Sequence, residues 1–149
     1  MCGIAGVIGP ESQKLIRSLD AAHGAQRHRG PDADGRWEQS YNGRTVALAH
    51  RRLAIIDLSS NANQPMTDPQ TGNVLVFNGE IYNFAELYEQ LRDKGLSFAT
   101  RSDTEVLLKA YATWGTDCVK HLRGMFAFAV WDAKTRSLLS ARDPRGIKP

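Results

Sequence analysis

Cys2, directly after the initiator methionine, is the residue of this chain best suited to nucleophilic chemistry. A small residue at position 2 normally allows Met1 to be removed, which leaves one residue with both a thiol and a free α-amine. A peptide α-amine has a pKa of about 7.7–8.0, so much of it can be neutral near neutral pH. The amine can then act as the base that activates the thiol, directly or through one water. The alternative for Cys2 is a packed small hydrophobic residue.

Asn78 and Gly79 could stabilise the charge that such a nucleophile creates. A thiolate that attacks an acyl carbon produces a tetrahedral oxyanion, which needs hydrogen-bond donors fixed in place. The pair follows the apolar residues 74–77, which are typical of a buried strand. The Asn78 side-chain amide and the Gly79 N–H could therefore converge on one oxygen. Asn-Gly is also a common turn dipeptide, and the residues alone leave both interpretations open.

Arg52 and Asp103 could bind the two charged groups of an α-amino acid. Arginine binds a carboxylate through two parallel hydrogen bonds. Asp103 lies in the first turn of a predicted helix, where it could bind an ammonium group. Each residue also has a structural alternative: a surface arginine, or an aspartate that compensates the helix dipole.

Composition is typical of one globular domain and excludes several other classes. The chain has 149 residues, of which 42% are hydrophobic and 23% are charged, and this length is enough to bury a core. No apolar run reaches membrane-spanning length and no secretory signal is visible, so we expect a cytoplasmic protein with no membrane partner. The net charge is +3 and the basic residues are dispersed, so we expect no nucleic-acid partner.

The two cysteines do not indicate a disulfide scaffold. Cys118 and His121 have a ligand-like spacing, but one pair is too few for a structural zinc site. We therefore expect Cys118 to be a packed thiol and no residue of the chain to bind a metal.

Hydrophobic periodicity and turn residues predict alternating strands and helices. Gly9-Pro10 should end the first strand, Asp34-Gly35 should mark a turn, and residues 59–72 should form a surface loop. Asn83 with Glu86, and Ser102 with Glu105, have capping-box spacing. The predicted strands are 4–8, 45–49, 53–56, 74–77, 125–131 and 138–141, the last two as a hairpin, and the predicted helices are 12–24, 84–94 and 103–114.

Seven ordered motifs together resemble one family, the class II glutamine amidotransferase domain of glutamine-hydrolysing asparagine synthetases. The resemblance covers essentially the whole chain. The motifs are Met-Cys-Gly-Ile-Ala-Gly at the start, Arg29-Gly30-Pro31-Asp32, Leu48-Ala49-His50-Arg51-Arg52-Leu53, Gln64-Pro65-Met66, Phe77-Asn78-Gly79-Glu80-Ile81-Tyr82-Asn83, Ser102-Asp103-Thr104-Glu105 and Gly124-Met125-Phe126-Ala127-Phe128-Ala129.

The resemblance implies an α+β fold for residues 2–149: an N-terminal-nucleophile hydrolase-like α/β/β/α sandwich of two mainly antiparallel sheets flanked by helices. It implies that Cys2 attacks the side-chain amide of glutamine, releasing ammonia and leaving a γ-glutamyl thioester that water hydrolyses to glutamate. The residues that match the family's site are Asn78 and Gly79 for the oxyanion, Arg52 for the α-carboxylate, Glu80 and Asp103 for the α-amino group, and the backbone of Leu53, Ala54, Ile55 and Ile56 for the pocket wall.

The family also implies a larger parent enzyme, in which a C-terminal synthetase domain uses ATP and Mg²⁺ to amidate aspartate. We expect no cofactor in the present residues and expect the domain to be truncated at its C-terminal end. The resemblance leaves open another ammonia acceptor, a homodimer of the full enzyme, and a non-catalytic glutamine-sensing domain of the same fold.

Overall fold

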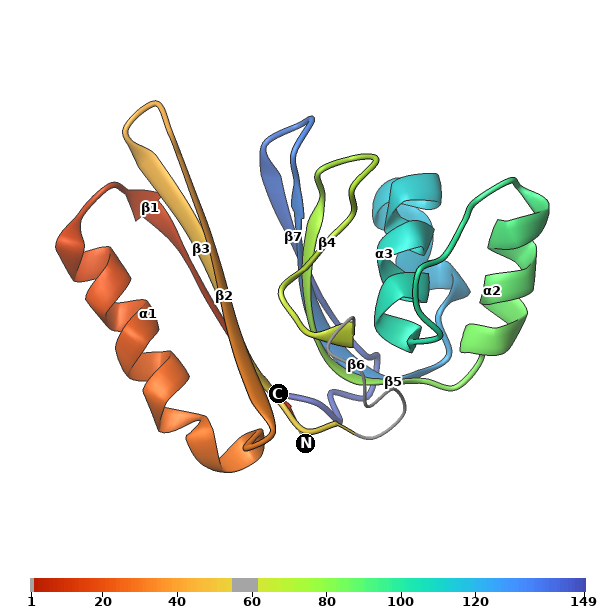
Figure 1. Ribbon diagram of the computed structural model, residues 1–149, viewed down its shortest axis with the longest axis horizontal. Helices are drawn as coiled ribbons and strands as arrows, with labels where there is room; N and C mark the ends of the chain where they lie inside the picture. Colours follow the sequence, from red (N-terminus) through yellow and green to blue (C-terminus); the bar gives the residue numbers. More distant parts are fainter. Residues whose placement is uncertain (1, 55–61) are drawn as a thin grey trace.

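Two antiparallel sheets stack face to face between helices in the computed structural model, which describes residues 2–54 and 62–149 (Figure 1). The first sheet has the strand order β1-β3-β2 and the second β4-β5-β6-β7. This confirms the predicted α/β/β/α sandwich. The elements are β1 (Gly3–Pro10), α1 (Gln13–Ala25), η1 (Arg27–Arg29), β2 (Ala33–Tyr41), β3 (Arg44–Arg52), β4 (Met66–Thr67), β5 (Val74–Ile81), α2 (Phe84–Asp93), α3 (Asp103–Trp114), η3 (Gly115–His121), β6 (Gly124–Asp132) and β7 (Ser137–Arg142).

Side-chain alternation along the strands builds the layers. On β3, Ala47 and Ala49 pack against Leu19 of α1, whereas Val46 and Leu48 face the second sheet. On β5, Val74 and Val76 face the first sheet. The apolar residues between and after them, Leu75, Phe77 and Ile81, face α2 and α3. Each strand therefore contributes to two cores, because successive side chains point to opposite faces. Figure 1 shows α1 outside the first sheet and α2 and α3 outside the second.

The cap expected at Ser102 forms, and the structure adds one at Ser12. Ser12 accepts a hydrogen bond from the N–H of Leu15 at the start of α1, and Ser102 accepts one from the N–H of Glu105 at the start of α3, both at 3.2 Å. The Glu105 carboxylate does not complete a capping box. It accepts instead from the backbone N–H groups of Ala99 and Thr100.

The expected capping box at Asn83 is wrong. Asn83 precedes α2, but its side chain makes no cap hydrogen bond. Its amide donates to the carbonyl oxygen of His121 at 3.0 Å and accepts from the N–H of Arg123 at 2.9 Å. The side chain therefore ties the end of β5 to the segment before β6.

Three strands differ from the sequence expectation. β1 extends through Pro10, which pairs with Arg44, as an edge strand permits. β3 continues through the basic triplet to Arg52, because β1 and β2 pair with it on both sides. Asp34-Gly35 consequently lies inside β2 rather than at a turn. The strand predicted for residues 53–56 does not begin at Leu53 or Ala54, and residues 55 and 56 lie outside the described residues.

β5 runs through Asn78-Gly79 to Ile81, so the pair is part of a strand and not a turn. The expected hairpin of β6 and β7 is confirmed, with Phe128 opposite Ala141. In the loop predicted for residues 59–72, Met66 and Thr67 form the short strand β4, which pairs with the start of β5.

Cys118 is fully buried in the core beside α3, as expected for a packed thiol. Burial raises its pKa to about 11, so the thiol stays protonated at neutral pH. The His121 ring stacks on Trp114 at 4.0 Å between ring centroids. Within the described ranges, no helix is long and apolar enough to span a membrane.

Candidate active site

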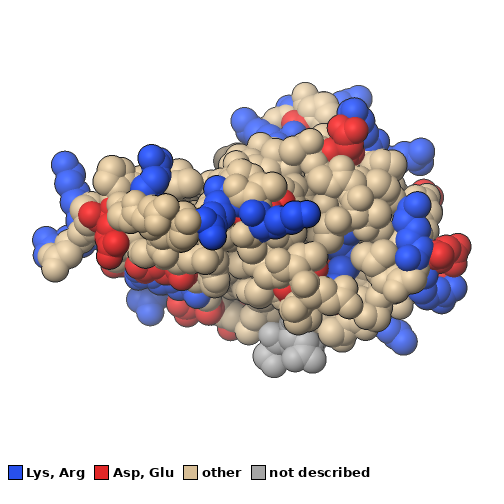
Figure 2. Space-filling model, turned by 90° about the horizontal axis from the view of Figure 1, so that it is seen from above, with Lys and Arg blue, Asp and Glu red and all other residues tan. Residues whose placement is uncertain are grey.

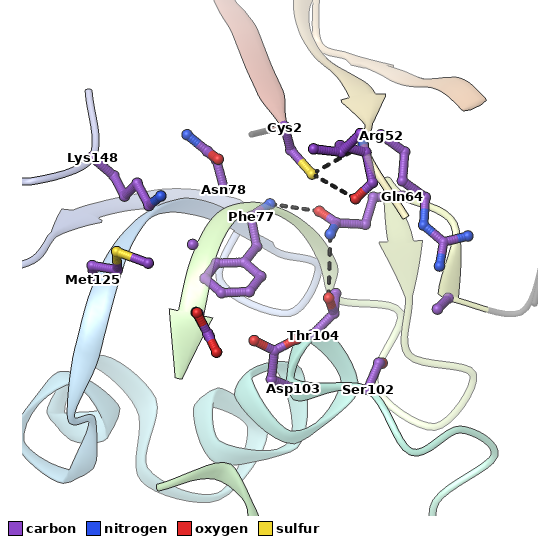
Figure 3. Close-up of a pocket in the computed structure, with 14 residues that line it drawn as sticks. Cys2, Arg52, Gln64, Phe77, Asn78, Ser102, Asp103, Thr104, Met125 and Lys148 are labelled. Atoms are coloured by element: carbon purple, nitrogen blue, oxygen red, sulfur yellow. Dashed lines mark hydrogen bonds between the residues drawn. The ribbon is translucent and has the colours of Figure 1, made fainter. Parts of the chain in front are cut away.

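Cys2 lies at the base of β1, against the chain that leaves β3. Its Sγ accepts a hydrogen bond from the N–H of Leu53 at 3.4 Å and lies 3.7 Å from the carbonyl oxygen of the same residue. Arg29 Nε donates to the Cys2 carbonyl oxygen at 3.1 Å. The residue is therefore held at its backbone and at its sulfur, on one wall of a cavity of about 130 Å³ (Figure 3).

The Arg29-Gly30-Pro31-Asp32 motif fixes this part of the chain. A Cβ at Gly30 would lie 2.4 Å from the carbonyl carbon of Arg51, so only glycine allows the motif to pack against the end of β3. The Asp32 N–H donates to the Arg52 carbonyl oxygen, and the Asp32 carboxylate accepts from the N–H of Ala54 at 2.9 Å. The motif thus shapes the wall on which Cys2 and Arg52 lie.

The register of β5 leaves the Gly79 N–H out of the sheet. Gly79 pairs with Phe126 of β6, but both backbone groups of Phe126 bond to Asp143 on the far side of β6. The Phe126 N–H donates to the Asp143 carboxylate, and the Phe126 carbonyl oxygen accepts from the Asp143 N–H. Gly79 and Phe126 are therefore a non-hydrogen-bonded pair. The Gly79 N–H and carbonyl point away from β6, at the edge of β5 where the cavity lies.

Asn78 presents its side chain to the face where Cys2 lies. It shares strand parity with Val74 and Val76, which face the first sheet, and β1 belongs to that sheet. Asn78 is 3% exposed and lines the same cavity as Cys2. Figure 3 shows both residues in the upper part of this cavity. Cys2, Asn78 and Gly79 thus line one cavity.

Arg52 and Asp103 place opposite charges on the wall of this cavity. Arg52 is 8% exposed and its Nη1 donates to Asn63 Oδ1 at 2.6 Å. The Asp103 carboxylate, at the start of α3, accepts from the N–H of Ile81 at 3.2 Å. Burial, assisted by the negative charge of Glu80 and opposed by the hydrogen bond from the Ile81 N–H, raises the pKa of Asp103 to about 6. A ligand ammonium group beside Asp103 would favour the ionised carboxylate.

The family model for the glutamine amidotransferase domain matches residues 1–149. The chain belongs to this family.

Relatives and a solved structure agree with the family and the fold. The chain is 40% identical to glutamine-hydrolysing asparagine synthetase 3 of Bacillus subtilis and 41% identical to synthetase 1 of the same organism. Each match covers 100% of the chain but only 24% and 23% of those proteins, so the chain spans about a quarter of their length. The structure of glutamine phosphoribosylpyrophosphate amidotransferase from B. subtilis superposes with a TM-score of 0.74 at 20% identity, covering 97% of this chain and 38% of that one. This likeness shows that the chain has the fold of the matched part of that amidotransferase.

The amidotransferase domain brings most of the predicted site residues to the one cavity. Its lining includes Cys2, Arg52, Leu53, Asn78, Gly79, Glu80 and Asp103. Ala54 does not line the cavity; its N–H binds Asp32. Ile55 and Ile56 lie outside the described residues.

Among the other residues that line the cavity of the amidotransferase domain are Gln64 and Lys148, to which the sequence alone assigned no role. Gln64 lies in one of the seven motifs, whereas Lys148 lies outside them. Lys148 reaches the cavity because residues 143–148 wrap around Asp143, whose carboxylate accepts from the N–H groups of Ile147 and Lys148. Burial opposes ionisation of Asp143, yet such backbone donors hold its pKa below the usual range. Residue spacing gives no signal for this arrangement.

Proposed function

We propose that this domain hydrolyses the side-chain amide of glutamine, with Cys2 as the nucleophile. The observation that supports it best is the convergence of the Cys2 thiol, the Asn78 amide and the outward-facing Gly79 N–H on one cavity. Arg52 and Asp103 supply charges of opposite sign on the wall of the same cavity, which suits the zwitterionic end of an α-amino acid.

In this proposal, loss of Met1 frees the α-amine of Cys2 to take the thiol proton. The thiolate forms a bond to the amide carbon of glutamine, and the oxyanion is stabilised by the Asn78 amide and the Gly79 N–H. When the intermediate collapses, the carbon–nitrogen bond breaks, and the nitrogen takes a proton and leaves as ammonia. Water then attacks the γ-glutamyl thioester, which gives glutamate and returns the proton to the thiol.

The other end of glutamine is assigned to charged and backbone groups. Arg52 binds the α-carboxylate, and Asp103 together with Glu80 binds the α-ammonium group. Leu53 lines the wall next to Cys2.

We assign the released ammonia to the ATP-dependent amidation of aspartate by a C-terminal synthetase domain, as the names of the B. subtilis relatives suggest. ATP and Mg²⁺ belong to that domain, and we assign no described residue to them. We also propose that the protein is cytoplasmic.

The test is glutaminase activity, measured as ammonia and glutamate release. Cys2→Ala should reduce activity to background while the protein keeps its fold, because the change removes the nucleophile and adds no bulk. Cys118→Ala is the matched control, since that thiol is buried in the core: it should cost stability but keep activity. Glutaminase activity that survives Cys2→Ala would contradict the proposal.

A further inference from the structure

We propose that Gln64 and His50 are positioning residues that clamp the backbone of Phe77, and thereby hold the neighbouring Asn78 and Gly79 in place for the oxyanion. The inference rests on the proposed glutaminase function and adds two residues to which that function gives no role. Neither touches the reacting atoms in this scheme; both act through β5.

The clamp exists because Phe77 faces the same edge of β5 as Gly79. Successive backbone groups of a strand point to opposite sides, so residues 77, 79 and 81 all direct their N–H groups away from β6. β4 covers this edge only as far as Leu75, which pairs with Met66. Beyond Leu75, other groups must satisfy the backbone, because a buried unpaired N–H or carbonyl is costly.

Side chains from two other segments satisfy both groups of Phe77. Its N–H donates to Gln64 Oε1 at 2.6 Å, and its carbonyl oxygen accepts from His50 Nε2 at 3.2 Å. Two residues farther along the edge, the Ile81 N–H donates to Asp103. Gly79 therefore lies between two backbone positions that are tied by side chains, and its own N–H faces the cavity.

Gln64 is itself fixed from two sides. It is 7% exposed, and its Nε2 donates to Thr104 Oγ1 at 3.2 Å in the first turn of α3, as the dashed lines in Figure 3 show. The backbone carbonyl oxygen of Gln64 lies against β2, where a Cβ at Gly35 would come within 2.1 Å of it. The Gln64 side chain thus sets the position of β5 relative to α3, the helix that carries Asp103.

His50 provides the second half of the clamp from the first sheet. It is completely buried on β3, two residues before Arg52. Burial, opposed by the hydrogen bond to Phe77 and assisted by the charge of Arg52, lowers its pKa to about 4, so the ring is neutral at pH 7. The carbonyl acceptor on Phe77 places the single ring proton on Nε2. His50 therefore joins the sheet of Cys2 and Arg52 to the sheet of Asn78 and Gly79.

The hydrogen bonds from Gln64 and His50 to Phe77 are buried and do not depend on the charged side chains of the surface. Figure 2 shows Lys and Arg side chains scattered over the face it displays, whereas Gln64 and His50 are buried polar groups that end on backbone atoms. Their placement is specific to the edge where β5 lacks a neighbouring strand.

The test compares steady-state kinetics with stability in the wild-type chain, in four single variants, and in Asn78→Ala with and without Gln64→Met. Gln64→Met keeps the length of the side chain but removes both hydrogen bonds, and His50→Leu removes the second half of the clamp. His50→Gln can place an Nε2 donor near Phe77 and is the conservative rescue. The control is Asn73→Leu: Asn73 is 4% exposed and accepts from the N–H of Ala133 at 3.1 Å, but it does not line the cavity.

We expect Gln64→Met and His50→Leu to lower kcat about tenfold or more, because small misplacements of catalytic groups are costly. KM for glutamine should change less than twofold, and His50→Gln should recover most of kcat. Asn73→Leu should lower the melting temperature but leave kcat unchanged. In an Asn78→Ala background, Gln64→Met should have a much smaller effect on kcat, since the two residues act on the same oxyanion.

Unchanged kcat in folded Gln64→Met, or a full tenfold loss also in the Asn78→Ala background, would overturn the clamp. If His50→Leu does not fold, Gln64→Met and His50→Gln still decide the matter. A wild-type chain without Cys2-dependent glutaminase activity would refute the proposed function instead. The clamp then remains testable by NMR, because loss of either tie should move the amide resonance of Gly79 while Asn73→Leu leaves it in place.

Discussion

The protonation state of Asp103 should control how tightly the site binds glutamine. It lines the cavity with Glu80 and Arg52, and burial raises its pKa to about 6. A protonated carboxyl group cannot attract an ammonium group, so glutamine binding should weaken as the pH falls below this value. We expect KM for glutamine to rise below pH about 6, approaching tenfold per pH unit. In Asp103→Asn, KM should be high and nearly independent of pH over the same interval; a pH dependence equal to that of the wild type would assign the titration to another group.

Arg52 and Asn78 should affect different kinetic constants. The α-carboxylate of glutamine keeps its charge throughout the reaction, so Arg52→Ala should mainly raise KM. The bond from Asn78 strengthens as the oxyanion forms, so Asn78→Ala should mainly lower kcat, by about 10²–10³-fold. Steady-state glutaminase assays of both variants separate the two effects. Equal losses in kcat with unchanged KM would show that this division of roles is wrong.

At the scale of the element, β5 explains why the site lies where it does. The strand is paired with β6 along its whole length but with β4 only at its start. Its free edge next to the cavity is therefore a row of backbone donors. Side chains use the donors of Phe77 and Ile81, and the Gly79 donor between them faces the cavity. Strand pairing, more than the Asn-Gly dipeptide itself, creates the proposed oxyanion hole.

Gly79→Ala tests the close packing of this strand. A Cβ at this position would lie 2.3 Å from the Met125 carbonyl oxygen, so β5 must shift away from β6. We expect a loss of about 1–3 kcal/mol in the free energy of unfolding, the usual cost of overpacking, and a loss of glutaminase activity. The control is Gly24→Ala in α1, where a Cβ meets nothing within 4 Å; it should gain about 0.5–1 kcal/mol. Denaturant unfolding measures both variants. An unchanged free energy of unfolding in Gly79→Ala would show that β5 is not closely packed against β6 at this position.

Local sequence signals predicted elements well where their partners are also local. The sequence predicts Ser102 as a helix cap because the N–H that it binds, that of Glu105, lies three residues away. Asn83 has the same type of signal, but its side chain binds a segment about 40 residues farther along the chain. β3 continues through His50-Arg51-Arg52 because two strands pair with it, and that pairing is not visible in the triplet itself.

The site residues divide in the same way, into those whose type indicates their role and those whose role depends on a distant partner. The types of Cys2, Arg52, Asn78 and Asp103 indicated their chemistry, and the family resemblance gathered them into one site. Gln64 and His50 could not be assigned a role from spacing, because both bind backbone atoms of Phe77, 13 and 27 residues away. Backbone acceptors and donors have no residue-type signature, so only the folded arrangement identifies such partners.

For the whole molecule, two buried groups should oppose each other in the dependence of stability on pH. His50 has a folded pKa of about 4 against 6.5 in the unfolded chain, so the unfolded state binds more protons and stability falls as the pH drops through this window. Asp103 has a folded pKa of about 6 against 3.8, so its contribution rises as the pH drops. Each is worth about 3 kcal/mol at 1.36 kcal/mol per pKa unit, and the two nearly cancel between about pH 4 and 6.

The variant Asp103→Asn should reveal the His50 contribution alone. Its free energy of unfolding should fall by about 2–3 kcal/mol between about pH 6.5 and 4.5, whereas that of the wild type should change much less. Urea unfolding at the two pH values measures both. A wild type and a variant with the same slope would show that Asp103 has no raised pKa in the folded state.

The most direct test of the central claim is mass spectrometry of the protein quenched with acid during glutamine turnover. Active protein should lack Met1, and one glutamyl group should be attached to the peptide that begins with Cys2. Cys2→Ala should carry no such adduct, and Cys118→Ala should carry it as the wild type does. Full activity in protein that retains Met1, or a glutamyl group on any other residue, would contradict the account.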